Sequence, residues 1–118
     1  MYNLPVSKKD IVSFNQEVGE RGDFSNEGSL DFALGIAGVK RNWLYELTYL
    51  VRSLLVDHVF QDGNKRTCLL LVIYYFDQRH LPYDREKLLT TLHKITKNNI
   101  SNPVLIARLL YHVIREKD

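Results

Sequence analysis

The sequence predicts a compact all-α fold, a bundle of about six helices, and three observations carry that prediction. Apolar residues recur at steps of three and four along most of the chain, as they do on one face of a helix. No segment shows the sustained alternation of apolar and polar residues that marks a half-buried strand. The three prolines, at positions 5, 82 and 103, stand where a helix can begin or a turn can fall.

The composition is that of one globular domain spanning residues 1–118. Hydrophobic residues make up 45% and charged residues 25%, which is enough apolar material for one core. A net charge of +2 is too weak for a non-specific nucleic-acid binder, which needs a concentrated basic face. The single cysteine, Cys68, allows no internal disulfide and fits a reducing cytoplasm. The longest apolar run, 68–76, is too short to span a bilayer, so we expect no membrane association.

The first two helices are predicted from capping signals and apolar spacing. Ser7, with Asp10 three residues later, resembles a capping box and places the first helix start there. Residues 19–28 contain three glycines among charged and small polar residues, so they are expected to form a loop. A short helix is then predicted over 29–37, with Gly38 as its stop.

The apolar spacing also predicts a helix over 43–57. Three further helices are predicted after it, in the second half of the chain. A helix over 64–80 is apolar nearly all round, which places it centrally, and Pro82 closes it. Asp84 is expected to cap a helix that runs to about Lys97. Asn102, followed by a proline in the first helical position, opens the last helix.

The stretch HVFQDGNKRT, residues 58–67, joins the helix at 43–57 to the helix at 64–80. The apolar spacing of the helix at 43–57, continued for one more step, reaches His58. The spacing therefore predicts His58 on the buried side, at the end of that helix. The turn residues Asp62, Gly63 and Asn64 then lead into the next helix. The corner is therefore expected to be a helix–loop–helix junction.

This corner has the residues of an anion site. The first N–H groups of a helix lack intrahelical partners, and the macrodipole adds partial positive charge there. Gly63 allows a ligand to approach the backbone, and Asn64 can cap the helix or donate its amide to an oxygen. Lys65 and Arg66 put two cations in a first turn, where helix stability disfavours them. A compensating anion is expected, and phosphate is the natural one.

Two further residues suggest chemistry at that anion. A carboxylate such as Asp62 would repel a phosphate unless a cation lay between them, and Mg²⁺ bound by one carboxylate and phosphate oxygens fits that need. His58 lies across the loop, and histidine, which titrates near neutral pH, is a workable general base for a hydroxyl nucleophile. The set suggests transfer of a phosphate-containing group to an alcohol.

Each of these residues also has an ordinary structural interpretation. His58 alone could be a buried or C-capping histidine, residues 62–64 a plain turn, and Lys65 and Arg66 solvated surface charges. Their order within ten residues at one corner favours the site. Cys68 is expected to be a small core residue. The remaining histidines lie on separate predicted helices without the spacing of a metal site.

The stretch HVFQDGNKRT resembles the Fic (filamentation induced by cAMP) signature HPFxxGNGRxxR. Five positions match it: His58, Phe60, Gly63, Asn64 and Arg66. Lys65 replaces the usual second glycine, and Leu69 replaces the second arginine. Both departures are shared with the death-on-curing (Doc) branch. The segment NEGSLDFALG, 26–35, is similar to the EGxLxxAL segment of Doc-like proteins, so the resemblance covers about 26–79.

The resemblance implies a six-helix Fic core and a nucleotide-dependent transferase that uses ATP and Mg²⁺. His58 would then be the general base, Asp62 would hold Mg²⁺, and Gly63 with Asn64 would supply the anion hole. Lys65 and Arg66 would bind the phosphates. Most Fic proteins transfer AMP to a target hydroxyl, whereas Doc is a kinase that phosphorylates a threonine of translation elongation factor Tu and acts as the toxin of a toxin–antitoxin pair.

The departures favour the kinase over AMP transfer. Leu69 removes one phosphate clamp of the AMP-transferring arrangement, and Lys65 adds a point charge in the loop. The loop 19–28 would dock the target segment or be an ordinary surface connection. Asp23 stands where the inhibitory (S/T)xxxE(G/N) motif of Fic proteins needs Ser or Thr, so control by a separate antitoxin is expected.

Two alternatives from other classes stay open. One is a non-catalytic Fic-like module that binds a nucleotide or a protein, but the presence of His58, Asp62 and Asn64 together favours the enzyme. The other is a plain helical interaction domain, which leaves two cations in a helix's first turn unexplained.

Overall fold

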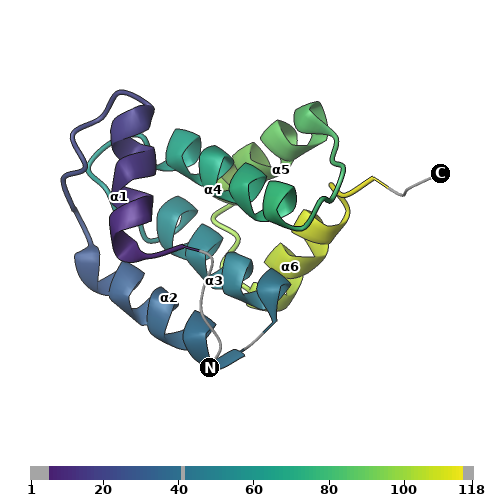
Figure 1. Cartoon of the computed structure of the whole chain (residues 1–118), viewed down its shortest axis with the longest axis horizontal. Coiled ribbons are helices and arrows are strands. Elements are labelled where there is room, and N and C mark those ends of the chain that lie inside the picture. The colour runs from purple at the N-terminus through teal and green to yellow at the C-terminus, as the bar shows by residue number, and fades with distance from the viewer. Residues whose placement is uncertain (1–5, 41, 116–118) are drawn as a thin grey trace.

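The computed structural model describes residues 6–40 and 42–115, and this part of the chain forms six α-helices (Figure 1). The all-α prediction is therefore confirmed. The helices are α1 (Lys8–Glu17), α2 (Glu27–Lys40), α3 (Trp43–Leu55), α4 (Asn64–Gln78), α5 (Arg85–Lys97) and α6 (Pro103–Tyr111).

The second helix is longer than predicted at both ends. It begins at Glu27 and continues through Gly38, which was expected to stop it. A glycine ends a helix by adopting a left-handed conformation. Gly38 does not do so, and the helix runs on to Lys40.

The predicted helix starts are confirmed by their hydrogen bonds. Ser7 and Asp10 form the expected capping box, in which each side chain accepts the other's backbone N–H. Asp84 accepts from the N–H of Lys87, and Asn102 accepts from the first turn of α6. Side-chain oxygens at these positions replace the intrahelical partners that the first turn lacks.

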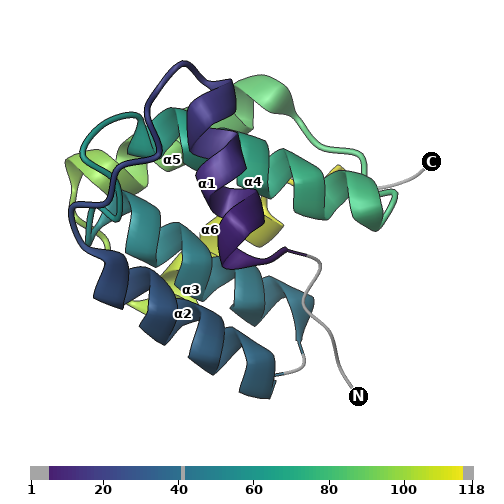
Figure 2. The same ribbon diagram turned by 60° about the vertical axis from the view of Figure 1, so that its left-hand side comes forward.

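Helix α3 is the centre of the fold. It packs against α2, α4, α5 and α6, and Figures 1 and 2 show it surrounded by them. Its side chains Leu47, Leu50 and Leu54 are fully buried, as its apolar spacing predicted. Helix α4, expected to be central, packs on α1, α3 and α5, so the loop 56–63 lies between two helices of the core. None of the described helices is long and apolar enough to cross a membrane.

Candidate active site

The loop after α3 does not present His58 on a buried helix face, so that prediction is wrong. Helix α3 ends at Leu55, with Val56 as its C-cap. His58 then adopts a left-handed backbone with φ 53°, a conformation that non-glycine residues rarely take, and its side chain is exposed. After this turn the buried positions are occupied by Val59 and Phe60, whose exposed fractions are 0% and 1%.

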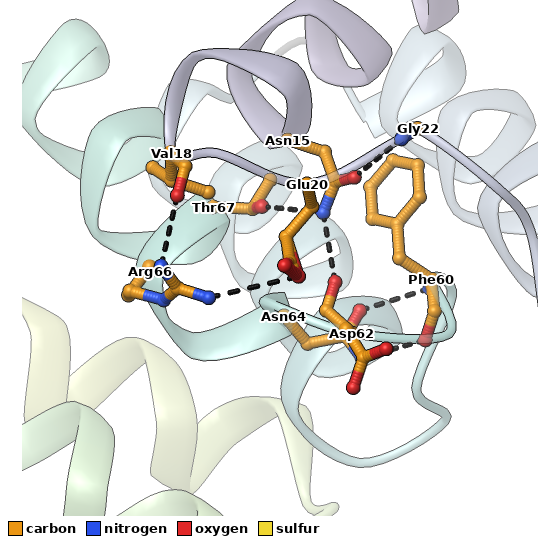
Figure 3. Close-up of polar contacts among 9 residues, drawn as sticks. All are labelled: Asn15, Val18, Glu20, Gly22, Phe60, Asp62, Asn64, Arg66 and Thr67. Carbon is orange, nitrogen blue, oxygen red and sulfur yellow. Dashed lines mark hydrogen bonds and ion pairs between the residues drawn. The ribbon is translucent and has the colours of Figure 1, made fainter.

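Asn64 closes the loop on itself. Its side-chain amide donates to the Phe60 carbonyl at 2.8 Å, and its Oδ1 accepts from the Phe60 N–H at 2.9 Å (Figure 3). Phe60 also stacks on Phe24, with ring centroids 5.3 Å apart. The Asn64 side chain therefore holds the shape of the loop and neither caps α4 nor offers its amide to a ligand, the two roles expected of it from the sequence.

The buried side chain of Asn15 joins α1 to the loop and to α4, and sequence reasoning missed it. Its Nδ2 donates to the Asp62 carbonyl at 2.9 Å and to Thr67 Oγ1 at 3.1 Å, while its Oδ1 accepts from the Gly22 N–H at 2.8 Å (Figure 3). Its signal in the sequence was a polar residue four positions after the buried Ile11, on the same helix face.

The loop that precedes α2, residues 19–26, is also tied to this corner. Backbone hydrogen bonds run from the Ser25 N–H to the Val59 carbonyl at 2.8 Å and from the Gln61 N–H to the Asp23 carbonyl at 3.0 Å. Asn15, Glu20 and Asp23 from this side border a small pocket of about 100 Å³ against Asp62. The loop at residues 19–26 therefore borders a pocket that shares Gln61 and Asp62 with a larger pocket.

Five of the six predicted site residues line one pocket of about 240 Å³. The pocket lies where the end of α3, the loop and the start of α4 meet, with Thr96 of α5 on its far side. A pocket of this volume at a helix N-terminus has room for a phosphate group. The five predicted residues are His58, Asp62, Gly63, Asn64 and Lys65.

Arg66, the sixth, lies outside that pocket. Its Nη1 donates to the Val18 carbonyl at the end of α1 at 2.8 Å, and its Nη2 lies 3.7 Å from a carboxylate oxygen of Glu20 (Figure 3). Glu20 also covers Gly63, because a Cβ at Gly63 would lie 2.6 Å from Glu20 Cγ. The anion that compensates Arg66 in this structure is therefore the protein's own.

Lys65 is placed differently. Its ammonium group lies 3.5 Å from Nδ1 of His93 and has no carboxylate partner in the described part of the chain. It also borders a mostly apolar pocket of about 180 Å³ between α4 and α5, which Leu69 and Leu89 line. Lys65 thus stands between a polar pocket and an apolar one.

The start of α4 has no side-chain cap. Its N-cap is Gly63, in a left-handed conformation with φ 76°, and no acidic residue lies in the first turn. The partial positive charge of the helix end and the full charge of Lys65 therefore meet at the 240 Å³ pocket without an opposing side chain in that turn.

The residues present fit a magnesium ion only if phosphate oxygens and water supply most of its ligands. No group of three or more His, Cys, Asp or Glu side chains among the described residues could hold a metal by itself. Asp62 is the one carboxylate lining the 240 Å³ pocket, and Mg²⁺ commonly takes one or two carboxylates together with phosphate oxygens and water.

Cys68 sits in the core and not in the site. It is fully buried in α4, and burial raises the pKa of its thiol, so it stays protonated and unreactive. The prediction that it is a core residue is confirmed.

Comparisons of the chain with models of protein families, with curated proteins and with solved structures found no match. The likeness to Fic proteins is therefore one of short motifs, and the function has to be argued from the site.

Proposed function

We propose that this protein is a Fic/Doc-type transferase that uses ATP to modify a hydroxyl group of a target protein, with γ-phosphoryl transfer as the reaction. One observation carries the proposal: the uncapped start of α4 opens into the pocket that His58, Asp62 and Lys65 also line. An uncapped helix N-terminus beside a lysine without a carboxylate partner among the described residues favours a phosphate, and a histidine in the same pocket favours chemistry on it.

In this proposal the phosphates bind at the start of α4. The backbone N–H groups of Gly63 and Asn64 and the ammonium of Lys65 provide the positive charge. Arg66 can reach a phosphate only after it separates from Glu20. The apolar pocket on the other side of Lys65 offers a surface for a ring, which supports a nucleotide over a free phosphate.

The transfer step assigns one role to each reacting group. The exposed imidazole of His58 accepts the proton of the target serine or threonine hydroxyl. The hydroxyl oxygen forms a bond to the γ-phosphorus, the bond from that phosphorus to the β,γ-bridging oxygen breaks, and ADP leaves. Mg²⁺, held by Asp62 and phosphate oxygens, would neutralise charge on the phosphates. The imidazolium then returns its proton to solvent.

The choice of γ-phosphoryl transfer rests on the two departures from the Fic signature. Leu69 lines the apolar pocket, so no guanidinium clamps a phosphate there. Lys65 borders the polar pocket and supplies a single mobile charge. The alternative is AMP transfer, in which the hydroxyl attacks the α-phosphorus and pyrophosphate leaves.

The biological setting follows from the resemblance. We propose a cytoplasmic toxin that acts on a translation factor such as an elongation factor and is held in check by an antitoxin protein. In this proposal the target segment would dock on the loop 19–28, which borders the pocket next to the site.

Labelled ATP tests the reaction. The protein is incubated in a cell lysate with Mg²⁺ and ATP labelled at the α- or the γ-phosphate. Label on a protein band from γ only is expected, and label from α would show AMP transfer instead. His58→Ala should slow the reaction by about 10²–10⁴-fold.

His80→Ala is the matched control. His80 is also exposed and also has a left-handed backbone, φ 54°, but it lies at the far end of α4. Its removal should leave the rate unchanged. Absence of label with either nucleotide in the wild type would overturn the transferase in favour of a binding module.

A further inference from the structure

Helix α2 is apolar on both of its faces. The inner face packs against α3 through buried residues such as Leu30, Ala33 and Ala37. The opposite face carries four residues at successive steps of four, three and four, which we call the outer seam. The outer seam consists of Gly28, Phe32, Gly35 and Val39.

The outer seam faces solvent. Phe32 is 56% exposed and Val39 is 78% exposed, the highest value among the exposed large hydrophobic side chains described. Figures 1 and 2 place α2 at the rim of the molecule, with α3 on its inner side. A surface helix normally presents polar residues on this face, and the outer seam has none.

The order of residues along the seam is complementary to itself. When two such helices run antiparallel about a two-fold axis, Phe32 of each meets Gly35 of the other, and Val39 meets Gly28. Each large side chain then faces a glycine. The space is available, because a Cβ at either glycine would have no neighbour within 4 Å. A parallel pair would instead set Phe32 against Phe32 and glycine against glycine.

The charged residues beside the seam do not oppose the pairing. Glu27 and Asp31 flank it, and both are paired with Lys8, whose ammonium lies 2.9 Å from Asp31. These pairs raise the pKa of Lys8, which keeps its charge. The following stretch of the helix, residues 33–39, contains no charged side chain.

From these observations we infer that two copies of this chain associate through antiparallel α2 helices, with Phe32 of one copy seated on Gly35 of the other. The interface is small, since a helix of 14 residues is about 21 Å long. The dimer is therefore weak and dependent on concentration. It does not depend on the proposed enzymatic activity.

Sedimentation velocity over a wide concentration range tests the pairing. The wild type is expected to shift from monomer to dimer as concentration rises, and Phe32→Glu to stay monomeric. Tyr111→Glu is the control, because Tyr111 is 62% exposed on α6, outside the seam. Circular dichroism confirms that each variant is folded. A wild type that stays monomeric, or an equal loss in both variants, would overturn the inference.

Disulfide trapping tests the register. The chain's own Cys68 is buried, so only the introduced thiols are expected to form disulfides between copies. A mixture of Gly28→Cys and Val39→Cys proteins should form a mixed disulfide dimer. Neither protein alone should, because like positions lie about 16 Å apart along the paired axes. Disulfides within either single protein would indicate a parallel pair, and no disulfide in any sample would reject the interface.

Discussion

The start of α4 differs from the start of every other helix in the described part of the chain. Five helices begin with a side-chain oxygen that accepts a first-turn N–H, whereas α4 begins with a left-handed glycine and has no side-chain cap. Such caps typically contribute about 1 kcal/mol each. The five capping residues are Ser7, Asn26, Asn42, Asp84 and Asn102.

The missing cap at the start of α4 indicates that helix stability was not the only requirement there. The five capped starts are closed locally, by a residue within three positions of the N–H it binds. The α4 start is held instead from a distance, by Asn15 on the Asp62 carbonyl and on Thr67. A helix end that is fixed in place while its N–H groups stay uncapped is suited to receive an anion.

The largest expected effect on stability comes from removing Asn15, the α1 residue that holds the start of α4 in place. Asn15→Ala removes three hydrogen bonds and leaves buried partners unsatisfied, so it should lower the free energy of unfolding by about 3 kcal/mol. Asn102→Ala, which removes an ordinary cap, should cost about 1 kcal/mol. Urea denaturation measures both. Equal losses would show that Asn15 does no more than a local cap.

The start of α3 provides a contrast in charge, because it buries a carboxylate where α4 carries cations. Among the described residues, neither oxygen of Glu46 has a hydrogen-bond partner of normal geometry, although the Tyr75 hydroxyl lies near enough to act on its pKa. Burial raises the pKa of Glu46 above its ordinary value of 4.5, against smaller opposing effects of Arg79 and the Tyr75 hydroxyl. The folded state therefore binds this proton more tightly than the unfolded state does.

It follows that Glu46 stabilises the fold most fully below pH 4.5, and that this contribution is lost as pH rises through the raised pKa. Glu46→Gln should remove that pH dependence and raise stability at pH 7 by about 1 kcal/mol. Thermal unfolding at pH 4 and pH 7 measures the change. The proposed explanation fails if wild type and variant show the same pH dependence.

Anion affinity should distinguish the uncapped start of α4 from the capped start of α5. Inorganic triphosphate should stabilise the wild type by about 2.7 kcal/mol at one hundred times its Kd. Lys65→Ala should weaken that binding about tenfold, which corresponds to about 1.4 kcal/mol. Lys87→Ala, which removes a cation from the first turn of the capped α5, should have no effect. Calorimetric titration measures each affinity, and equal weakening by both variants would contradict a specific site.

The smallest effect on stability is expected at the pair between Glu20 and Arg66. The Arg66 side chain is 59% exposed and the separation is 3.7 Å, so Glu20→Gln should change the free energy of unfolding by less than about 0.5 kcal/mol. Triphosphate should nevertheless bind more tightly, because Arg66 becomes available. Unchanged affinity would mean that Arg66 plays no part in anion binding.

Much of the fold could be predicted because its signals are local. The capping box at Ser7 and Asp10 and the caps Asp84 and Asn102 act within three residues, and each was found where predicted. The position of His58 could not be predicted. Extrapolating a helix pattern assumes that the helix continues, and α3 ends at Leu55.

The sequence by itself determined the number and kind of helices, most of their starts, and the short stretch that carries the candidate site residues. Helical spacing and capping are properties of neighbouring residues, so they can be read without the fold. Only the tertiary structure decided that Arg66 is paired with Glu20 while Lys65 has no carboxylate partner among the described residues, and that Asn15 supports the loop. The contacts of Arg66 and Asn15 join residues 46 to 52 positions apart, and their geometry depends on how α1 packs against α4.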